Sequence, residues 1–286
     1  MTSSLKSEAV ARAFLDACLA ELDALKPGNV HRFGDGHSMT VADFVKSAEA
    51  AAPLIGRRGL GVGRRIRLAV EAARRVVSQN TNLGIILLTA PLANAALGRR
   101  SGDLQSRLRQ VLQTLSVDDA REAYRAIRDT NPGGLGEAPE HDVREEPKVS
   151  LLEAMRAAET RDRIAWNYTH DFADIFHLGL RWLAHTRERW SDPAWGAARV
   201  YLGFLAHVPD TLIERKFGER IAARVREEAR PIESSFTECP SPEAMTAPLT
   251  AFDRSLKERG LNPGTSADLT VATLFAAALI RLESAE

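Results

Sequence analysis

The stretch Gly84–Leu97, GIILLTAPLANAAL, contains no charged residue and decides the fold. A helix that is apolar on every side belongs in the centre of a bundle, so we expect Leu87 and Leu88 to be buried. The stretch is too short and too mixed in composition to span a bilayer. Pro91 lacks a backbone N–H, which predicts a kink inside this helix.

The rest of the chain repeats apolar residues at helical spacing. Val10, Phe14, Cys18 and Leu22 recur every four residues and therefore share one helix face. Similar stripes cover residues 40–55, 64–78, 102–115, 118–129, 150–160, 162–189, 193–206, 210–229, 242–259 and 266–283. The sequence shows no sustained alternation of apolar and polar residues, so strands are not expected. It predicts an all-α fold, a single globular bundle of about ten to twelve helices in which residues 1–286 form one domain around the apolar central helix.

Four segments break this helical pattern. They are Lys26–Met39, Asn131–Val149, Pro231–Pro240 and Leu261–Thr265. We expect these segments to be loops. Long loops in a compact helical protein often carry function, so the candidate chemistry is sought there.

Composition excludes several classes of function. The chain has 286 residues, with 38 Lys plus Arg against 38 Asp plus Glu, so no basic tail for nucleic acid is expected. Cys18 and Cys239 lie far apart and cannot form a disulfide framework or a zinc ribbon. Glu8 and Asp16 fall inside an amphipathic pattern, which indicates a folded helix and not a signal peptide. We therefore expect a cytoplasmic protein with no membrane and no nucleic-acid partner.

The first loop offers donors for phosphate oxygens. Its candidate ligand contacts are Lys26, Gly28, His31, Arg32 and His37. Glycine lets the backbone approach a ligand closely, and the cationic side chains suit an anion. The alternative is a solvated connector that follows a helix. The sequence alone leaves both interpretations open.

Three short polar residues precede the apolar helix: Asn80, Thr81 and Asn82 are followed by Leu83 and Gly84. A buried helix N-terminus needs its free N–H groups satisfied, so capping is one explanation. A helix N-terminus is also a ready anion site. Capping explains one such residue and not three, which favours a ligand role.

Two further segments combine glycine with charge. Gly133 and Gly134 stand before the carboxylates Glu137 and Asp142, which could hold Mg²⁺ because this hard cation prefers oxygen ligands. The alternative is an acidic, flexible loop. In Pro209–Gly218, Asp210 could cap a helix, while Arg215 and Lys216 are either phosphate ligands or surface charges. His170, Asp174 and His177 share a helix face but match no common metal motif.

The order of these segments resembles the triphosphoribosyl-dephospho-CoA synthase family. From about Glu21 to Leu279 the chain carries, in order, KPGNVHR, NTNLG, GGLGE with HDV, SLLEAM, RDRIAWNY, PDTLIERKFG and NPGTSADLT. The resemblance implies an all-helical, transferase-like domain. It also implies a reaction that joins ATP to 3′-dephospho-CoA and releases adenine.

The sequence differs from the best-known members of that family in one place. They carry Thr-His-Lys-Gly where this chain has Thr81-Asn82-Leu83-Gly84, so a lysine is lost from a phosphate site. The NTNLG form resembles the branch found in methanogens and methylotrophs. That branch implies an alternative function, a transfer or condensation on a phosphorylated precursor of one-carbon carrier coenzymes of the methanopterin or methanofuran type.

The resemblance implies displacement at the anomeric carbon of a ribose, through an oxocarbenium-like transition state. The residues it implies for catalysis are Glu137, Asp142, Asp268 and His37, with His31 or His37 as the proton donor to the leaving base. The residues it implies for substrate or cofactor binding are Lys26, Gly28, His31, Arg32, Asn80, Thr81, Asn82, Gly84, Gly133, Gly134, Asp210, Arg215 and Lys216. Asp268 is a candidate for ribose or metal contact, or a helix cap.

ATP is then a substrate, Mg²⁺ the expected cofactor at Glu137 and Asp142, and a homodimer a possibility. A further alternative is a non-catalytic interaction protein, which predicts a long exposed apolar patch and no convergent pocket. We instead predict that the Lys26–His37 loop and the Asn80–Gly84 turn face one pocket.

Overall fold

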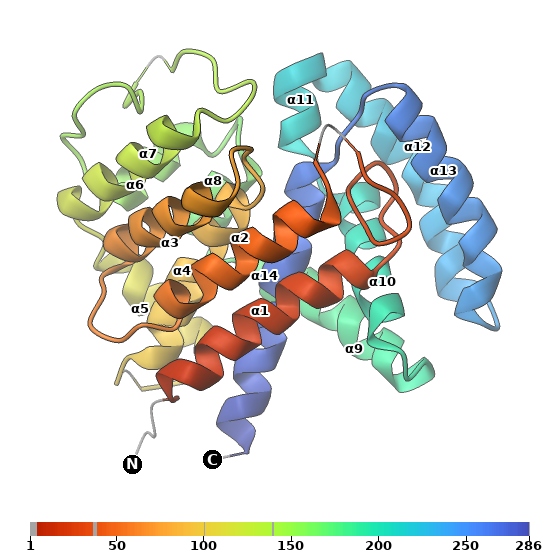
Figure 1. The fold of residues 1–286 in the computed structure, drawn as a ribbon, viewed down its shortest axis with the longest axis horizontal. Coiled ribbons are helices and arrows are strands. Elements are labelled where there is room, and N and C mark those ends of the chain that lie inside the picture. The colour runs from red at the N-terminus through yellow and green to blue at the C-terminus, as the bar shows by residue number, and fades with distance from the viewer. Residues whose placement is uncertain (1–4, 37–38, 100, 139, 286) are drawn as a thin grey trace.

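The computed structural model describes residues 5–36, 39–99, 101–138 and 140–285, and these residues contain no β-strand. The prediction of an all-α fold is confirmed (Figure 1). The α-helices are α1 Ser7–Asp23, α2 Val41–Ile55, α3 Val62–Val76, α4 Leu83–Leu97, α5 Leu104–Gln113, α6 Val117–Thr130, α7 Leu151–Ala158, α8 Arg163–Thr169, α9 Leu180–Arg189, α10 Pro193–His207, α11 Thr211–Phe217, α12 Glu219–Glu238, α13 Thr246–Glu258 and α14 Gly264–Ser284. A π-helix, Asp174–Gly179, and a short 3-10 helix, Pro242–Met245, complete the list.

The helix predicted over 162–189 is broken, and this correction has a backbone cause. After α8, Asp171 and Phe172 adopt φ angles of 50° and 57°, in the left-handed region that ends a right-handed helix. The chain then resumes as the π-helix and continues into α9. Gly179 closes the π-helix against α14, where a Cβ atom would lie 2.3 Å from Thr273 Oγ1.

Two further helix boundaries differ from the prediction. The helix expected over 210–229 divides into α11 and α12 at Gly218, whose φ of 88° is strained for any residue with a side chain. The loop expected at Pro231–Pro240 is wrong, because α12 runs through Pro231 to Glu238. Proline costs this helix one backbone hydrogen bond. Buried Phe236, which packs against Trp190 and Trp195, holds the last turns in place.

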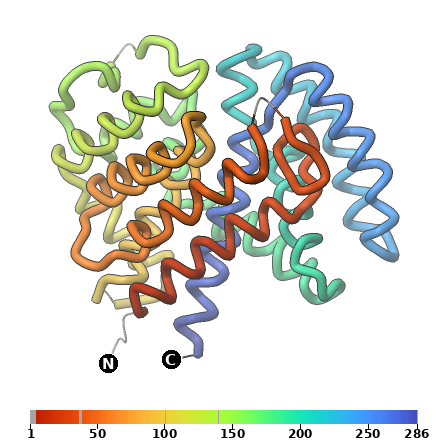
Figure 2. The backbone as a smooth tube through the Cα atoms, in the orientation of Figure 1, coloured from red at the N-terminus to blue at the C-terminus, as the bar shows by residue number. Residues whose placement is uncertain are grey.

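Two apolar helices form the centre. Helix α4 packs against α1, α2, α3, α5 and α14, and both Leu87 and Leu88 are buried, as predicted. Figure 2 shows α14 running through the middle of the molecule, behind α1 and α2. Phe275 of α14 meets Phe14 of α1 edge to face, with ring centroids 6.0 Å apart. The buried apolar side chains form one contiguous core.

Helix α14 alone among the described helices is long and apolar enough to cross a membrane, judged by length and composition. However, 72% of its apolar window is buried inside the protein. That burial is typical of a core helix, because its apolar side chains already contact protein.

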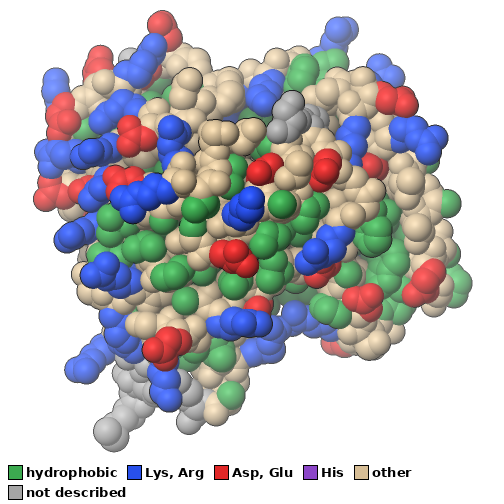
Figure 3. All heavy atoms as spheres, in the orientation of Figure 1, with side chains coloured by type: hydrophobic (Ala, Val, Ile, Leu, Met, Phe, Trp, Pro, Cys, Tyr) green, Lys and Arg blue, Asp and Glu red, His purple; other side chains and the backbone are tan. Residues whose placement is uncertain are grey.

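The surface carries charges of both signs. The face seen in Figure 3 intersperses Lys and Arg with Asp and Glu, in keeping with the formal net charge of zero. The large apolar side chains that the described residues expose are Phe33, Val76, Phe217 and Ile280, from four separate segments. They give no support to a non-catalytic interaction protein, which requires a continuous apolar patch.

Candidate functional site

A polar cavity of about 80 Å³ lies at the N-terminal end of α4. Its polar lining comes from the end of α1, the first loop, the turn before α4 and the start of α14. The lining residues are Glu21, Asn29, Met39, Phe44, Asn80, Thr81, Asn82, Leu83, Gly84, Ile85, Leu212, Asn262, Gly264, Ala267 and Asp268. Asn29 of the first loop and the Asn80–Gly84 turn line the same cavity, which confirms that these two segments face one pocket.

Two carboxyl groups line this cavity, Asp268 and Glu21, and Glu21 is paired with Lys26. Asp268 lies on the first turns of α14, directly against Gly84, where a Cβ atom would come within 2.0 Å of its Oδ2 atom. Gly84 is therefore required for the close crossing of α4 and α14. Within the described part of the chain, no residue donates a hydrogen bond to Asp268.

Burial raises the pKa of Asp268 well above its ordinary value. The neighbouring carboxylates of Asp210, Glu21 and Asp162 raise this pKa further, whereas the guanidinium of Arg215 lowers it. Burial and like charge both disfavour the ionised form. Asp268 therefore keeps its proton to a higher pH than an exposed aspartate does.

The three polar residues before α4 have three different roles. Asn80 Oδ1 accepts a hydrogen bond from Leu83 N at 3.2 Å, and Thr81 Oγ1 donates to Ser47 Oγ of α2 at 2.7 Å. Asn82 is 6% exposed and its Nδ2 atom has no hydrogen-bond partner. A buried donor without a partner costs free energy, so a ligand that accepts from Asn82 Nδ2 would remove that cost.

Lys26 is bound within the protein. Its side chain is 1% exposed, forms an ion pair with Glu21 and donates to Asn29 Oδ1 at 3.1 Å. Asn29 Nδ2 in turn donates to Asn262 Oδ1 at 2.8 Å. Burial lowers the pKa of Lys26, and Glu21 opposes this shift. Because a buried ammonium requires a counter-ion, Glu21 serves as the counter-ion of Lys26.

The side chains of His31 and Arg32 contact other parts of the protein. His31 is buried, with Nε2 3.4 Å from Asp253 Oδ1, and its Nδ1 accepts from Phe33 N at 3.2 Å. Arg32 pairs with Asp23 in an exposed position. Neither residue lines the cavity, so the structure does not place His31 as a donor to a leaving base. His37 lies outside the described residues.

A cluster on α13 fixes the first loop. Asp253 Oδ1 accepts from Gly28 N at 2.8 Å, and Lys257 donates to Gly34 O at 3.1 Å. Burial raises the pKa of Asp253, but hydrogen bonds from His31, Gly28 and Lys257 outweigh it, and the net shift is downward. Gly28 has φ 81° and packs directly on Leu261 O. Sequence reasoning missed Asp253 and Lys257; their spacing of four residues on one helix face was the only signal.

Asp210 connects α11 to α14. It caps α11 by accepting from Ile213 N at 3.2 Å, and it also accepts from Ser266 N at 2.8 Å and Ser266 Oγ at 2.9 Å. Burial raises its pKa, although these hydrogen bonds act in the opposite direction. The capping role considered for Asp210 is therefore present, and Asp210 also holds the start of α14 in position.

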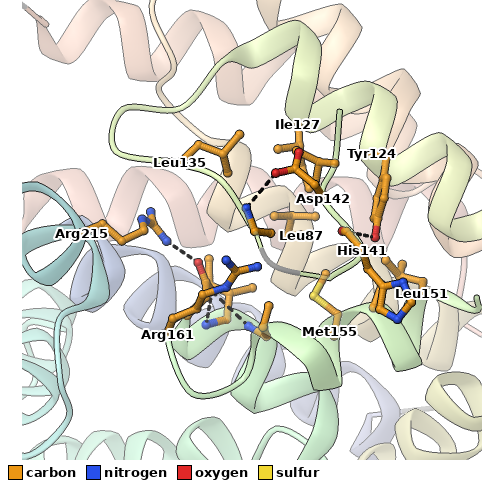
Figure 4. A pocket seen from close by; sticks show the side chains of 18 residues that line it. Leu87, Tyr124, Ile127, Leu135, His141, Asp142, Leu151, Met155, Arg161 and Arg215 are labelled. Atoms are coloured by element: carbon orange, nitrogen blue, oxygen red, sulfur yellow. Dashed lines mark hydrogen bonds and ion pairs between the residues drawn. The ribbon is translucent and has the colours of Figure 1, made fainter. Parts of the chain in front are cut away.

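Arg215 lines a different cavity, together with Leu135 and Gly136 of the loop that joins α6 to α7 (Figure 4). It forms an ion pair with Asp162, and Asp162 also caps α8 through Ile164 N at 2.9 Å. The buried Nε atom of Arg215 has no hydrogen-bond partner. Lys216 lies beside Gly133, where a Cβ atom would be 2.9 Å from Lys216 Cε. The segments that carry these cations and glycines therefore meet in space.

The carboxylates of the long loop do not form a magnesium site. Asp142 accepts from Ala138 N at 2.8 Å and from Arg144 Nη2 at 2.7 Å, and Glu137 also faces Arg144. Hydrogen bonds from Arg144 lower the pKa of Asp142. The guanidinium of Arg144 already holds the Asp142 carboxylate and also lies 3.4 Å from Glu137, so the arrangement of Glu137 and Asp142 does not fit the expected Mg²⁺ site. In the described ranges no three His, Cys, Asp or Glu side chains are grouped to hold a metal.

The other possible metal face, His170, Asp174 and His177, has a structural role. Arg163 binds Asp174 through Nε at 2.7 Å and lies over the Trp166 ring, 3.5 Å from its centroid. His170 stacks on the same indole, with centroids 4.0 Å apart. These contacts hold α8 against the π-helix.

Comparison with known proteins assigns this chain to a family. The family model described as CitG, ATP:dephospho-CoA triphosphoribosyl transferase, matches residues 7–286. Over 83 residues the chain is 42% identical to a protein of Albidiferax ferrireducens named as a 2-(5''-triphosphoribosyl)-3'-dephosphocoenzyme-A synthase. That match covers 28% of this chain and 26% of the relative.

A solved structure shows the same fold. A protein of Archaeoglobus fulgidus described as a triphosphoribosyl-dephospho-CoA synthase matches with a TM-score of 0.63 and 23% identity. The match covers 82% of this chain and 97% of that one. At this sequence identity the similarity supports the fold alone.

Proposed function

Because the chain belongs to the ATP:dephospho-CoA triphosphoribosyl transferase family, we propose that it transfers a triphosphoribosyl group from ATP to 3′-dephospho-CoA. The product is 2′-(5″-triphosphoribosyl)-3′-dephospho-CoA, and adenine is released. One observation carries this proposal. A carboxyl group with a raised pKa, Asp268, lies in a polar cavity without a hydrogen-bond donor from the described residues.

The proton balance of this transfer suits a single carboxyl group. The 2′-hydroxyl of the acceptor bonds to C1′ of the ATP ribose, and the bond from C1′ to adenine N9 breaks. Adenine leaves with an added proton, and the hydroxyl loses one. Asp268 gives the first proton and takes up the second, so it ends the cycle protonated. Between these steps its carboxylate stabilises the oxocarbenium-like transition state.

The neighbouring residues orient the substrate. Asn82 Nδ2 offers its unused hydrogen bond to a ribose hydroxyl or a phosphate oxygen. Arg215, with its unpartnered Nε, and Lys216 beside Gly133 supply positive charge for the triphosphate. The charges of Lys26 and Glu21 balance each other beside the site. The hydrogen bond between Asn29 and Asn262 holds the first loop against the start of α14.

No step of this scheme runs through a metal ion, since Glu137 and Asp142 bind Arg144. Mg²⁺ remains a prediction that concerns the triphosphate of ATP and not a protein-held site. The cytoplasmic location, the single domain and the homodimer also remain predictions.

The decisive experiment incubates the protein with ATP, Mg²⁺ and 3′-dephospho-CoA and measures adenine by mass spectrometry. We expect adenine release, and a loss of about 10²–10⁴-fold in Asp268→Asn, because the amide cannot transfer the proton. Glu258→Gln, a change at an exposed position of α13, is the matched control and should retain full activity. Absence of adenine with the unaltered protein would exclude the proposed reaction.

A second candidate is transfer or condensation on a phosphorylated precursor of one-carbon carrier coenzymes. The observation that favours it is the uncharged turn before α4. Leu83 is buried and Asn82 is neutral, so this turn offers no cation to a triphosphate. Binding of such a precursor, together with no adenine release from ATP and dephospho-CoA, would replace the first candidate by the second.

A further inference from the structure

A second, apolar cavity of about 130 Å³ lies beneath the loop that joins α6 to α7. Its lining includes Leu87 of α4, Ile127 of α6, Leu135 of the loop, and Leu151 and Met155 of α7. Figure 4 shows these side chains directed toward a common space. An apolar space of this kind is an ordinary setting for the flat, apolar part of a ligand.

The loop above this cavity is held in one conformation by specific contacts. The Tyr124 hydroxyl donates to His141 O at 2.7 Å, and Arg128 donates to Val143 O at 2.7 Å. Asn131 and His141 adopt φ angles of 45° and 52°, in the left-handed region that few non-glycine residues occupy. The contacts of Asp142 with Arg144 belong to the same arrangement. The carboxylate predicted as a metal ligand therefore shapes this loop.

One side of the cavity is cationic. Figure 4 places Arg161 and Arg215 on this side, and Tyr124 and His141 on the other. The side chain of Arg161 forms no hydrogen bond or ion pair with any residue in the described ranges, and Arg215 keeps an unpartnered Nε atom. A ligand with an apolar body and an anionic group at one end matches this arrangement.

The apolar cavity adjoins the polar one. Ile164 lines the apolar cavity, and its Cδ1 atom would lie 2.9 Å from a Cβ atom at Gly84, which lines the polar cavity. Leu83 and Leu87 are one turn apart on α4 and line the polar and the apolar cavity respectively. The two cavities therefore lie close together at Ile164 and Gly84.

We infer that the apolar cavity binds the adenine base of an adenosine 5′-phosphate compound, with Arg161 on its phosphate side. The inference rests on the proposed function, since both of its substrates, ATP and dephospho-CoA, contain that group. An aromatic heterocycle suits the apolar walls, and a ribose attached to it reaches toward Asp268. The glycine-rich loop then leaves room for the phosphates.

The first test fills the cavity. Ala154→Leu on α7 adds three carbon atoms to its wall, and Ala157→Leu adds them to the exposed face of the same helix. Calorimetry measures binding of ATP, dephospho-CoA and tripolyphosphate. We expect Ala154→Leu to weaken ATP or dephospho-CoA at least tenfold and to leave tripolyphosphate unchanged, which also shows that the variant is folded. Ala157→Leu should match the unaltered protein.

The result identifies which substrate occupies the cavity. If only the binding of ATP is weaker, the cavity holds the adenine of the donor. If only the binding of dephospho-CoA is weaker, it holds the adenine of the acceptor. Unchanged binding of both compounds by Ala154→Leu overturns the inference, and so does an equal loss of tripolyphosphate. No binding of either compound to the unaltered protein overturns it as well.

The second test removes the free guanidinium and does not alter the core. Arg161→Ala should weaken the binding of the same adenine compound about tenfold or more, which corresponds to the loss of a charge-assisted hydrogen bond. The binding of adenosine, which has no phosphate, should be unchanged. Arg156→Ala, at an exposed position of α7, is the control. Equal affinities in Arg161→Ala and Arg156→Ala would overturn the role of Arg161. These binding tests do not require turnover, so failure of adenine release would overturn the proposed reaction and leave the cavity inference standing.

Discussion

Asp268 is surrounded by charged groups from several helices. Burial raises its pKa, as do Asp210 before α11, Glu21 of α1 and Asp162 before α8, and Arg215 of α11 lowers it. Lys26 adds a further positive charge on the α1 side. The pKa of Asp268, the acid in the proposed reaction, therefore depends on side chains from several elements. A substitution at any of them should change that pKa.

Arg215→Gln tests this control of the acid. The reaction requires protonated Asp268, so kcat should fall as the pH rises through the pKa of Asp268 in the folded protein. Arg215 lowers that pKa, and its loss also leaves Asp162 negative and unpaired. We expect the fall in kcat to move to higher pH, measured at saturating substrate. Arg220→Gln, at an exposed position of α12, should not move it.

Asn82→Ala separates ligand binding from stability. Asn82 Nδ2 has no protein partner, so its loss should not lower the free energy of unfolding. It should weaken ATP by about 2- to 12-fold, the value of one neutral hydrogen bond. Thr81→Val gives the contrast, because it breaks the hydrogen bond to Ser47 and should lower stability. Urea unfolding and calorimetry measure both effects, and a destabilised Asn82→Ala would contradict the assignment.

The sequence could identify residue types at this scale but not their partners. Asp268 and Asn82 were correctly located as polar residues at the two helix starts that meet in the cavity. The phosphate role predicted for Lys26 stays a prediction, but nothing in the sequence shows that Glu21, five residues earlier, lies within reach of it. Asp142 was expected to bind a metal, and its pairing with Arg144 could not be predicted because it depends on the loop conformation.

Among the helices, the crossing of α4 and α14 is the feature that determines the geometry of the site. Gly84→Ala would place a methyl group 2.0 Å from Asp268 Oδ2, so the two helices must separate or the carboxyl must turn. We expect Gly84→Ala to lose most of the adenine-release activity, with only a small change in melting temperature. Gly61→Ala is the control, because a Cβ atom there meets only Asp119 Oδ1, at 3.4 Å. Normal activity in Gly84→Ala would show that the crossing does not limit the reaction.

Helix periodicity located the elements but missed their breaks. Apolar spacing continues across Gly218 and across Asp171 and Phe172, so the sequence predicted uninterrupted helices there. The breaks depend on left-handed backbone angles, which an apolar pattern does not record. At Pro231 the error was the reverse. Local propensity predicted a loop, and the packing of Phe236 against two tryptophans favours the helix.

On the scale of the whole molecule, stability depends on the contacts of α14. Phe275 is fully buried and meets the Phe14 ring at an angle of 87°. Phe275→Ala should lower the free energy of unfolding by about 3–5 kcal/mol, because it removes apolar contacts and leaves a cavity. Val76→Ala, at a half-exposed position of α3, should change it by less than about 1 kcal/mol. Similar urea midpoints for the two variants would contradict a central role for α14.

The site is assembled from segments that are far apart in the sequence. Glu21, Asn82, Asp210 and Asp268 come from four different elements, and no local pattern shows that they converge. The order of motifs indicated the family, and the helical spacing indicated an all-α bundle with an apolar centre. Their convergence depends on how α14 lies against α1 and α4.

The stack of Arg163 and His170 on Trp166 gives the molecule an intrinsic fluorescent reporter. The protein has four tryptophans, and Trp182, Trp190 and Trp195 pack against Phe204 or Phe236 in its other half. Trp166 is four residues after Asp162, the partner of Arg215. A ligand that draws Arg215 away from Asp162 should therefore alter the emission of one indole, and substrate binding can be followed in the unlabelled protein.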